Sequence, residues 1–158
     1  MRAALILVFL LGSATFAGAQ QRNAMVPGDW VQEPRESARA PLRFISPDGT
    51  AWLALHATPA DRRGRNYASA AAGERVTYQR RTSRFVAVSG FRGDRIFYRK
   101  SNLACGGSRW HHIALEYPAE DKRKLDRLVT RVAHGMNRYD NDCRSSAGET
   151  SGGLVRGR

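Results

Sequence analysis

The feature that most constrains the fold of this sequence is a strand signal joined directly to a helix signal between Trp110 and Met136. The segment WHHIALEY alternates in the manner of a half-buried β-strand. One predicted face carries His111, Ile113, Leu115 and Tyr117, and the other carries Trp110, His112, Ala114 and Glu116. Because successive strand residues point to opposite faces, adjacent histidines here should lie on opposite sides of a sheet.

The helix signal begins at Pro118, which suits a first helical turn because no helical hydrogen bond needs its missing N–H. Glu120 and Asp121 then place negative charge at the positive end of the helix dipole. Apolar residues follow at intervals of three and four, namely Leu125, Leu128, Val129, Val132 and Met136. This single stripe predicts an amphipathic helix packed on the sheet, and Gly135 is the predicted stop.

Residues 1–19 are typical of a secretory signal peptide. Arg2 supplies positive charge, residues 3–11 form an apolar run, and Ala17-Gly18-Ala19 matches a small-residue cleavage site. A membrane anchor is the alternative, but the run is shorter than the roughly 20 residues that span a bilayer. We therefore expect cleavage near Ala19 and a periplasmic or secreted protein. It would remain strongly cationic, because the formal net charge of +12 loses only one arginine.

Cys105 and Cys143 are the only two cysteines, and an even count in an exported chain favours a disulfide. The strand at residues 110–117 would cover about 26 Å. A helix returning from Pro118 to Gly135 would cover about 27 Å, which brings the second cysteine back to the first. A redox or metal-binding pair is the alternative, but CxxC spacing and a ligand cluster are both missing.

The rest of the chain divides into a flexible lead-in at residues 20–41, a domain at 42–143 and a disordered Ser/Gly-rich tail at 144–158. With 158 residues and 42% hydrophobic residues, the chain suits a single domain with its own core. Two predicted strands, at residues 42–45 and 50–57, flank Ser46-Pro47-Asp48-Gly49 and predict a hairpin.

After the hairpin, the alanine-rich stretch 67–72 predicts a short helix ended by Gly73. Three β-rich segments, at residues 75–81, 85–89 and 95–100, predict an antiparallel meander. The expected fold class is therefore α+β. It consists of an antiparallel β-meander with a short helix after the first hairpin and a C-terminal amphipathic helix packed on the sheet.

Three sequence features together carry a resemblance to a known fold family. The segment ALEYP is followed at once by the amphipathic helix, GFRGDRIFYRK lies within the meander, and SPDG opens the first hairpin. Over Leu42 to Met136 the chain resembles the PsbP-like α/β/α sandwich, and it is similar to small exported bacterial proteins of uncharacterised function. The resemblance implies the architecture alone, because proteins on this scaffold include photosystem accessory subunits and Ran-binding proteins with no shared chemistry.

Histidine is the residue type most able to supply catalysis here, and the four are His56, His111, His112 and His134. His134 is expected on the outer face of the helix, while His56 and His112 could share a sheet face. Hydrogen-bonded structural histidines are the favoured interpretation, because HExxH, a Cys/His cluster and a carboxylate motif are all missing. No cofactor or metal site is expected.

The basic residues are the stronger functional signal. They cluster in the middle of the chain among the aromatic residues Tyr78, Phe91, Phe97 and Tyr98. Such a combination can bind phosphates and stack on bases or sugars. The predicted anion-binding set is Arg80, Arg81, Arg84, Arg95 and Arg99. A solvated cationic face that only maintains solubility is the alternative.

Two functions from different classes remain open. The favoured one is an exported, non-enzymatic binding or accessory domain whose basic face meets an anionic envelope component or a protein partner, with nucleic acid less favoured. The other is a small secreted hydrolase, such as a basic nuclease using His56 and His112. A hydrolase needs at least two titratable groups in one cleft, which the three-dimensional structure can test.

Overall fold

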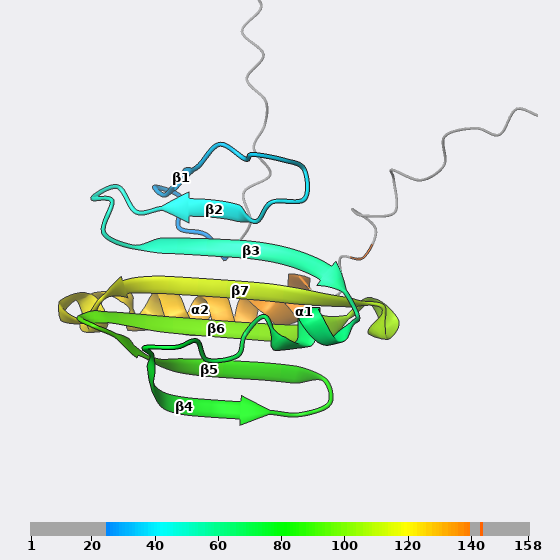
Figure 1. Cartoon of the computed structure of the whole chain (residues 1–158). Coiled ribbons are helices and arrows are strands. Elements are labelled where there is room, and N and C mark those ends of the chain that lie inside the picture. Colours follow the sequence, from blue (N-terminus) through cyan, green and yellow to red (C-terminus); the bar gives the residue numbers. More distant parts are fainter. Residues whose placement is uncertain (1–24, 140–142, 144–158) are drawn as a thin grey trace, which may run out of the picture.

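The computed structural model describes residues 25–139 and residue 143. The predicted signal segment and tail lie outside the described residues. One sheet organises the structure, and its seven antiparallel strands follow the order β1-β2-β3-β7-β6-β5-β4 (Figure 1). The elements are β1 (Val31–Gln32), β2 (Leu42–Ile45), β3 (Trp52–Pro59), α1 (Arg62–Asn66), β4 (Arg75–Arg81), β5 (Phe85–Arg92), β6 (Arg95–Ala104), η1 (Cys105–Gly107), β7 (Arg109–Pro118), η2 (Ala119–Asp121) and α2 (Lys122–Tyr139).

The antiparallel sheet with a C-terminal helix confirms the α+β class and the predicted hairpin and meander. Asp48 organises the turn of the first hairpin, where its Oδ1 accepts hydrogen bonds from the Ser46 hydroxyl at 2.5 Å and the Thr50 N–H at 3.2 Å. These bonds stabilise the carboxylate and hold the pKa of Asp48 well below its usual range. Gly49, with a φ of 71°, completes the turn.

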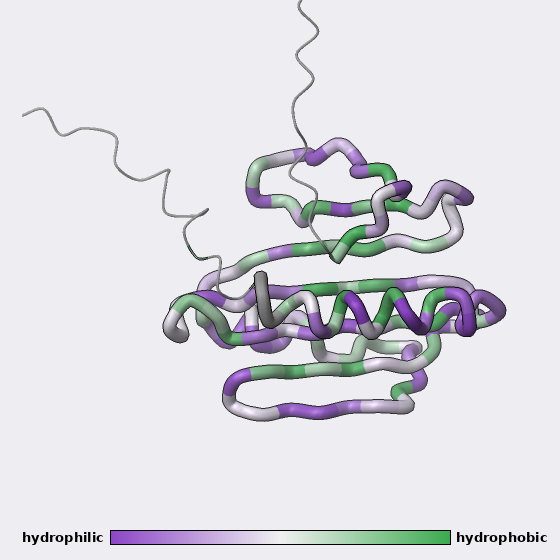
Figure 2. The backbone as a smooth tube through the Cα atoms, turned by 180° about the vertical axis from the view of Figure 1, so that it is seen from behind, coloured by the Kyte–Doolittle hydropathy of each residue, from purple (hydrophilic) through white to green (hydrophobic). Residues whose placement is uncertain are grey.

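Helix α2 lies over β7 and β6 on one side of the sheet, which we call the back face (Figure 2). Leu128, Val132 and Met136 of the predicted apolar stripe are buried there, in one core cluster with Leu53 and Ile113. The strand residues of this cluster are those that alternation places on a single face of β3 and β7. In the described residues no helix covers the back of β4 and β5.

The prediction that Gly135 ends the helix is wrong, because α2 continues to Tyr139. Gly135 instead allows a close approach to Met25. A Cβ at Gly135 would lie 2.3 Å from the Met25 Cγ, and Met25 itself is buried in the core. The described part of the predicted lead-in therefore contributes to the fold, and its strand β1 pairs with β2 at the sheet edge.

The opposite side of the sheet, the front face, is crossed by residues 60–74, which we call the front cover (Figure 1). Its helix α1 begins after Asp61, whose side chain accepts the Gly64 N–H at 2.7 Å. The helix predicted at residues 67–72 does not form. Those residues follow the sheet surface instead, since the Tyr67 ring stacks on a strand residue and Ala68 is fully buried.

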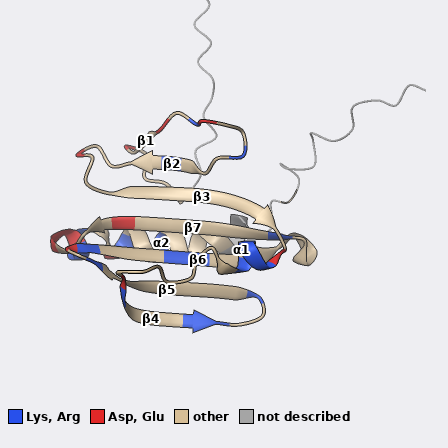
Figure 3. Cartoon of the chain, viewed as in Figure 1, with Lys and Arg blue, Asp and Glu red and all other residues tan. Residues whose placement is uncertain are grey.

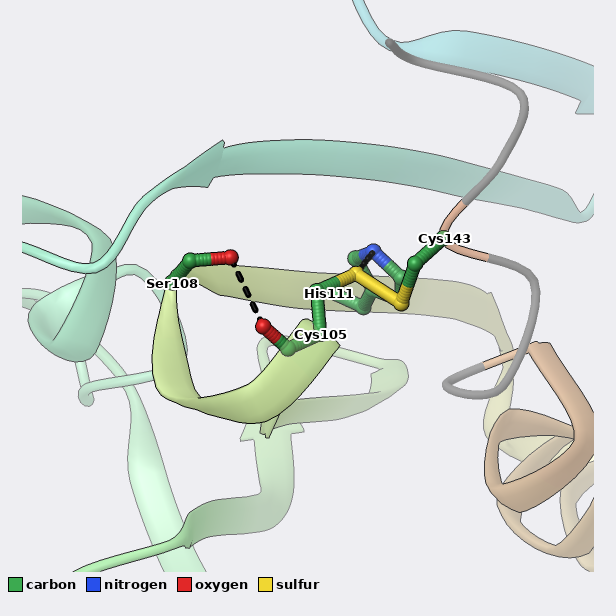
Figure 4. Close-up of a disulfide and its surroundings, with 4 residues drawn as sticks. All are labelled: Cys105, Ser108, His111 and Cys143. Carbon is green, nitrogen blue, oxygen red and sulfur yellow. Dashed lines mark hydrogen bonds between the residues drawn. A yellow bond between two sulfur atoms is a disulfide. The ribbon is translucent and has the colours of Figure 1, made fainter.

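The predicted disulfide joins Cys105 in η1 to Cys143, with a Cα–Cα distance of 5.5 Å (Figure 4). Cys105 itself has a φ of 53°, and its carbonyl oxygen accepts the Ser108 hydroxyl at 2.8 Å. His111 lies alongside, with Nε2 3.9 Å from the Cys105 Sγ. The bond therefore ties the chain beyond α2 to the end of β6.

Candidate functional site

A histidine cluster lies on the front face where β3 and β7 pair. His56 is directly opposite His112 in the strand register, and the two ring centroids are 5.9 Å apart. Tyr67 from the front cover stacks on His112 with a centroid distance of 4.3 Å. The two histidines thus share a sheet face, as the sequence suggested. His111 lies on the other face near the disulfide, and His134 is exposed on α2.

The imidazole of His112 is fully buried and hydrogen-bonded at both nitrogens. Its Nε2 lies 2.8 Å from the Thr58 hydroxyl, and its Nδ1 lies 2.7 Å from the Ser101 hydroxyl. Burial, and then the neighbouring His56 and His111, lower the pKa of His112 to about 3. The ring is therefore neutral at physiological pH, with one nitrogen donating and the other accepting.

This arrangement does not suit acid–base catalysis. A general base must reach the substrate, whereas His112 exposes no surface and both its nitrogens are engaged. Burial also lowers the pKa of His56, and Arg35 adds to the shift. Across residues 25–139 and 143 there is no group of three or more His, Cys, Asp or Glu side chains that could hold a metal ion. The cluster has the features of a structural core.

A second front-face feature is an ion-pair network of three arginines and two glutamates. Arg95 Nε lies 2.6 Å from the Glu116 carboxylate, and Arg92 contacts both Glu116, at 3.3 Å, and Glu74, at 2.5 Å. Arg99 also pairs with Glu74, whose side chain is completely buried. Glu74 lies at the end of the front cover, so these pairs attach the cover to β5 and β6.

The five predicted anion-binding arginines do not form one surface. Arg95 and Arg99 share the front face, as expected, but carboxylates already bind them. Arg81 also lies on the front face, where it donates to the Ser69 hydroxyl at 2.9 Å. Arg80 projects from the back of the same strand, and exposed Arg84 lies in the β4–β5 turn. Arg80 and Arg81 separate because adjacent strand residues alternate in direction.

Sequence analysis did not single out the residues whose partners lie far away along the chain. Glu74 and Glu116 approach Arg99 and Arg95 from distant segments, and periodicity carries no signal for such pairs. Arg75 was visible only as one of many basic residues, but it lies over the Phe91 ring. Figure 3 shows basic segments on α1, β4 and β6. The ion pairs with Glu74 and Glu116 distinguish the arginines that are bound to carboxylates from the others.

No protein-family model matches this chain, and no curated protein matches it as a relative. None of the helices among the described residues is long and apolar enough to cross a membrane.

Proposed function

We propose that this protein is an exported, non-enzymatic binding or accessory domain that uses arginines of β4 and its turn to hold an anionic surface or partner. One observation carries the proposal. Four arginines in this region are exposed, and none makes an ion pair with a carboxylate among the described residues. They are Arg75, Arg80, Arg81 and Arg84. Unneutralised guanidinium groups on one sheet edge attract phosphate, sulfate or carboxylate groups.

A compartment outside the cytoplasm best fits this function. The Cys105–Cys143 disulfide suits an oxidising environment, and the signal-like residues 1–19 would direct the chain to the periplasm or the exterior. An anionic envelope component, such as lipid phosphate or acidic polysaccharide, is then the expected ligand. Nucleic acid is scarce in such compartments and is the weaker choice.

We also propose a PsbP-like sandwich architecture for the domain. Its parts are a short helix after the first hairpin on one face and an amphipathic α2 packed on the other. The support is the burial of Leu128, Val132 and Met136 against the sheet and of Gly64 near Trp110. This architecture provides a scaffold for binding surfaces and specifies no chemistry of its own.

The hydrolase alternative draws little support from the histidine cluster. His56 and His112 lie close together, but His112 is inaccessible, and its ring is neutral near pH 7 and so cannot serve as an imidazolium acid. The other competing explanation is a cationic face that serves solubility alone. It predicts that removing the same number of arginines from any part of the surface weakens anion binding equally.

Heparin chromatography tests the proposal. We expect the wild type to bind and to elute with increasing salt, because exposed charges are screened beyond about 8 Å at physiological ionic strength. An R80S/R81S/R84S variant should elute at lower salt than a charge-matched R123S/R127S/R131S variant of α2. The helix arginines should matter less, since neighbouring carboxylates such as Asp126, which pairs with Lys122, reduce their field. Identical elution of the two variants would leave the charge as a solubility feature.

A further inference from the structure

Beside α2 on the back face, aromatic residues of β4, β5 and β6 lie together with two arginines. We call this surface the aromatic–arginine platform, and its members are Arg75, Tyr78, Arg80, Phe85, Phe91 and Tyr98. Tyr78 is 47% exposed and is one of only two large hydrophobic side chains exposed among the described residues. Exposed aromatic side chains next to basic ones are features of binding surfaces.

A bulge in β4 brings the platform residues to one face. Arg75 and Tyr78 are three residues apart and would point to opposite faces in a regular strand. The register shifts between Val76 and Tyr78, so both residues face the back. Gly90 makes room for this bulge, because a Cβ there would lie 2.1 Å from the Arg75 carbonyl oxygen. The β4 backbone is thus shaped in a way that adds Arg75 to the platform.

Each of the two arginines lies over a phenylalanine ring. The Arg75 guanidinium carbon lies 4.4 Å from the Phe91 ring centroid, and that of Arg80 lies 5.5 Å from the Phe85 centroid. Stacking leaves the edge N–H groups of a guanidinium available to an anion. The two phenylalanines are at opposite ends of β5, about 20 Å apart. Cationic positions separated by this distance suit an extended polymer better than a small ion.

The centre of the platform offers rings rather than charges. Tyr78 and Tyr98 lie on either side of Ser89, each directly opposite it in the register. Burial, reinforced by Tyr78, raises the pKa of Tyr98 to about 12, so its hydroxyl remains a hydrogen-bond donor at physiological pH. A polymer lying between the two arginines would therefore meet the exposed Tyr78 ring, with the half-buried Tyr98 beside it.

We propose that the platform binds an extended acidic polysaccharide, with sugar rings stacked on Tyr78 and acidic groups paired with Arg75 and Arg80. This inference rests on the proposed function and names its ligand class and site. Single-stranded nucleic acid also stacks and carries negative charge, but the Cys105–Cys143 disulfide indicates a compartment where nucleic acid is scarce. A polymer with charge but no rings would use the arginines alone.

The test separates stacking from charge with three probes: heparin, poly-glutamate and oligo(dT). Affinities are measured by titration calorimetry at one salt concentration for the wild type, Y78S, Y78F and R75S/R80S. The control is R62S/R63S, which removes the same charge from exposed residues of α1 on the front face. Melting curves verify that each variant folds.

We expect Y78S to weaken heparin binding about tenfold, the effect of losing one stacking contact, while poly-glutamate binding is unchanged. Y78F should retain heparin binding because it keeps the ring. R75S/R80S should weaken binding to both polymers more than R62S/R63S does. Equal heparin affinity for Y78S and the wild type would overturn the platform but leave the anion-binding function standing. Tighter wild-type binding to oligo(dT) than to heparin would overturn the polysaccharide assignment, and binding to none of the probes would overturn both proposals.

Discussion

The two faces of the sheet are covered by different means. The back face is covered by α2, whose Leu128, Val132 and Met136 join a continuous apolar core, and a disulfide follows the helix. The front face is crossed by the front cover, which is attached through a histidine stack at His112 and ion pairs at Glu74. Apolar burial and covalent bonds respond little to pH, whereas buried histidines and carboxylates respond strongly.

Arginines therefore have different roles on the two faces. Front-face Arg99 pairs with Glu74 and so holds the front cover, while back-face Arg80 has no carboxylate partner among the described residues. The front cover should therefore lose stability when its titratable groups change protonation. The back face should lose stability when apolar contacts or the disulfide are removed. The platform should tolerate substitution with little loss of stability.

Acidification should produce the largest effect, and it acts on the front face through His112. The pKa of this residue falls from 6.5 to about 3 on burial, so the unfolded chain takes up the proton first as pH decreases. The contribution of neutral His112 to the free energy of unfolding is complete above pH 6.5 and is lost between pH 6.5 and about 3. The expected loss over this range is about 5 kcal/mol. Urea unfolding of wild type and H112Q across this range measures it. Parallel pH profiles for the two proteins would contradict the prediction.

Loss of the disulfide should come next. The bond closes a loop with a sequence separation of 38 residues, so C143S should lower the free energy of unfolding by about 4 kcal/mol in the chain-entropy model. The intact protein should lack the mass of two hydrogens and should resist alkylation until it is reduced. Alkylation of both thiols without reductant would show that Cys105 and Cys143 are not paired.

L128A should weaken the back cover by about 3 kcal/mol, because it leaves a cavity between α2 and the sheet. R127A, at the adjacent exposed position, is the matched control and should change stability by less than about 0.5 kcal/mol. Denaturant melts compare the two. Equal stability of L128A and R127A would mean that α2 does not depend on its apolar stripe.

E74A should loosen the front cover by about 2 kcal/mol, since it leaves Arg99 without its carboxylate. Burial alone would raise the pKa of Glu74, but hydrogen bonds from Ala71, Arg99 and Arg92 outweigh it and hold the pKa below 4.5. The contribution is therefore full above pH 4.5 and is lost as pH falls through the lowered value.

The measurement is hydrogen exchange of the front cover in wild type and E74A at neutral pH, with E36A as an exposed control. Faster exchange at residues 67–74 in E74A alone is the expected result. Uniform exchange in all three proteins would show that the ion pairs do not hold the cover.

The smallest stability effect is expected on the platform. R80S should change the free energy of unfolding by less than about 0.5 kcal/mol, because it removes only an exposed stack on Phe85. R99S should cost clearly more, as it leaves Glu74 buried without a main partner. Thermal melts of the two variants compare one arginine from each face. A larger loss in R80S than in R99S would reverse the roles assigned to the two faces.

Local patterns predicted much of the fold. Alternation located β7, turn residues located the β2–β3 hairpin, and the pairing of Cys105 with Cys143 followed from a count of two and from element lengths. These features depend on residues close in sequence or on simple geometry. The helix predicted at residues 67–72 failed because the stacking of Tyr67 on the sheet outweighs the helix propensity of alanine.

The candidate site was less accessible from the sequence. The arginine-rich middle of the chain was evident, but its division between two faces was not. The β4 bulge changes the alternation that would place Arg75, and Glu74 reaches Arg99 across 25 residues of chain. Gly135 likewise matched a helix stop, while its actual role is contact with Met25.

By itself, the sequence determined the strand–proline–helix unit, the hairpin, the disulfide partners and the excess of positive charge, because each depends on local periodicity or composition. Only the tertiary structure decided which arginines are neutralised and which remain available. That outcome depends on carboxylates and aromatic rings brought from distant segments, such as Glu74 to Arg99 and Phe91 to Arg75. Ion pairing and stacking act over a few ångströms in space, and separation along the chain does not reveal that proximity.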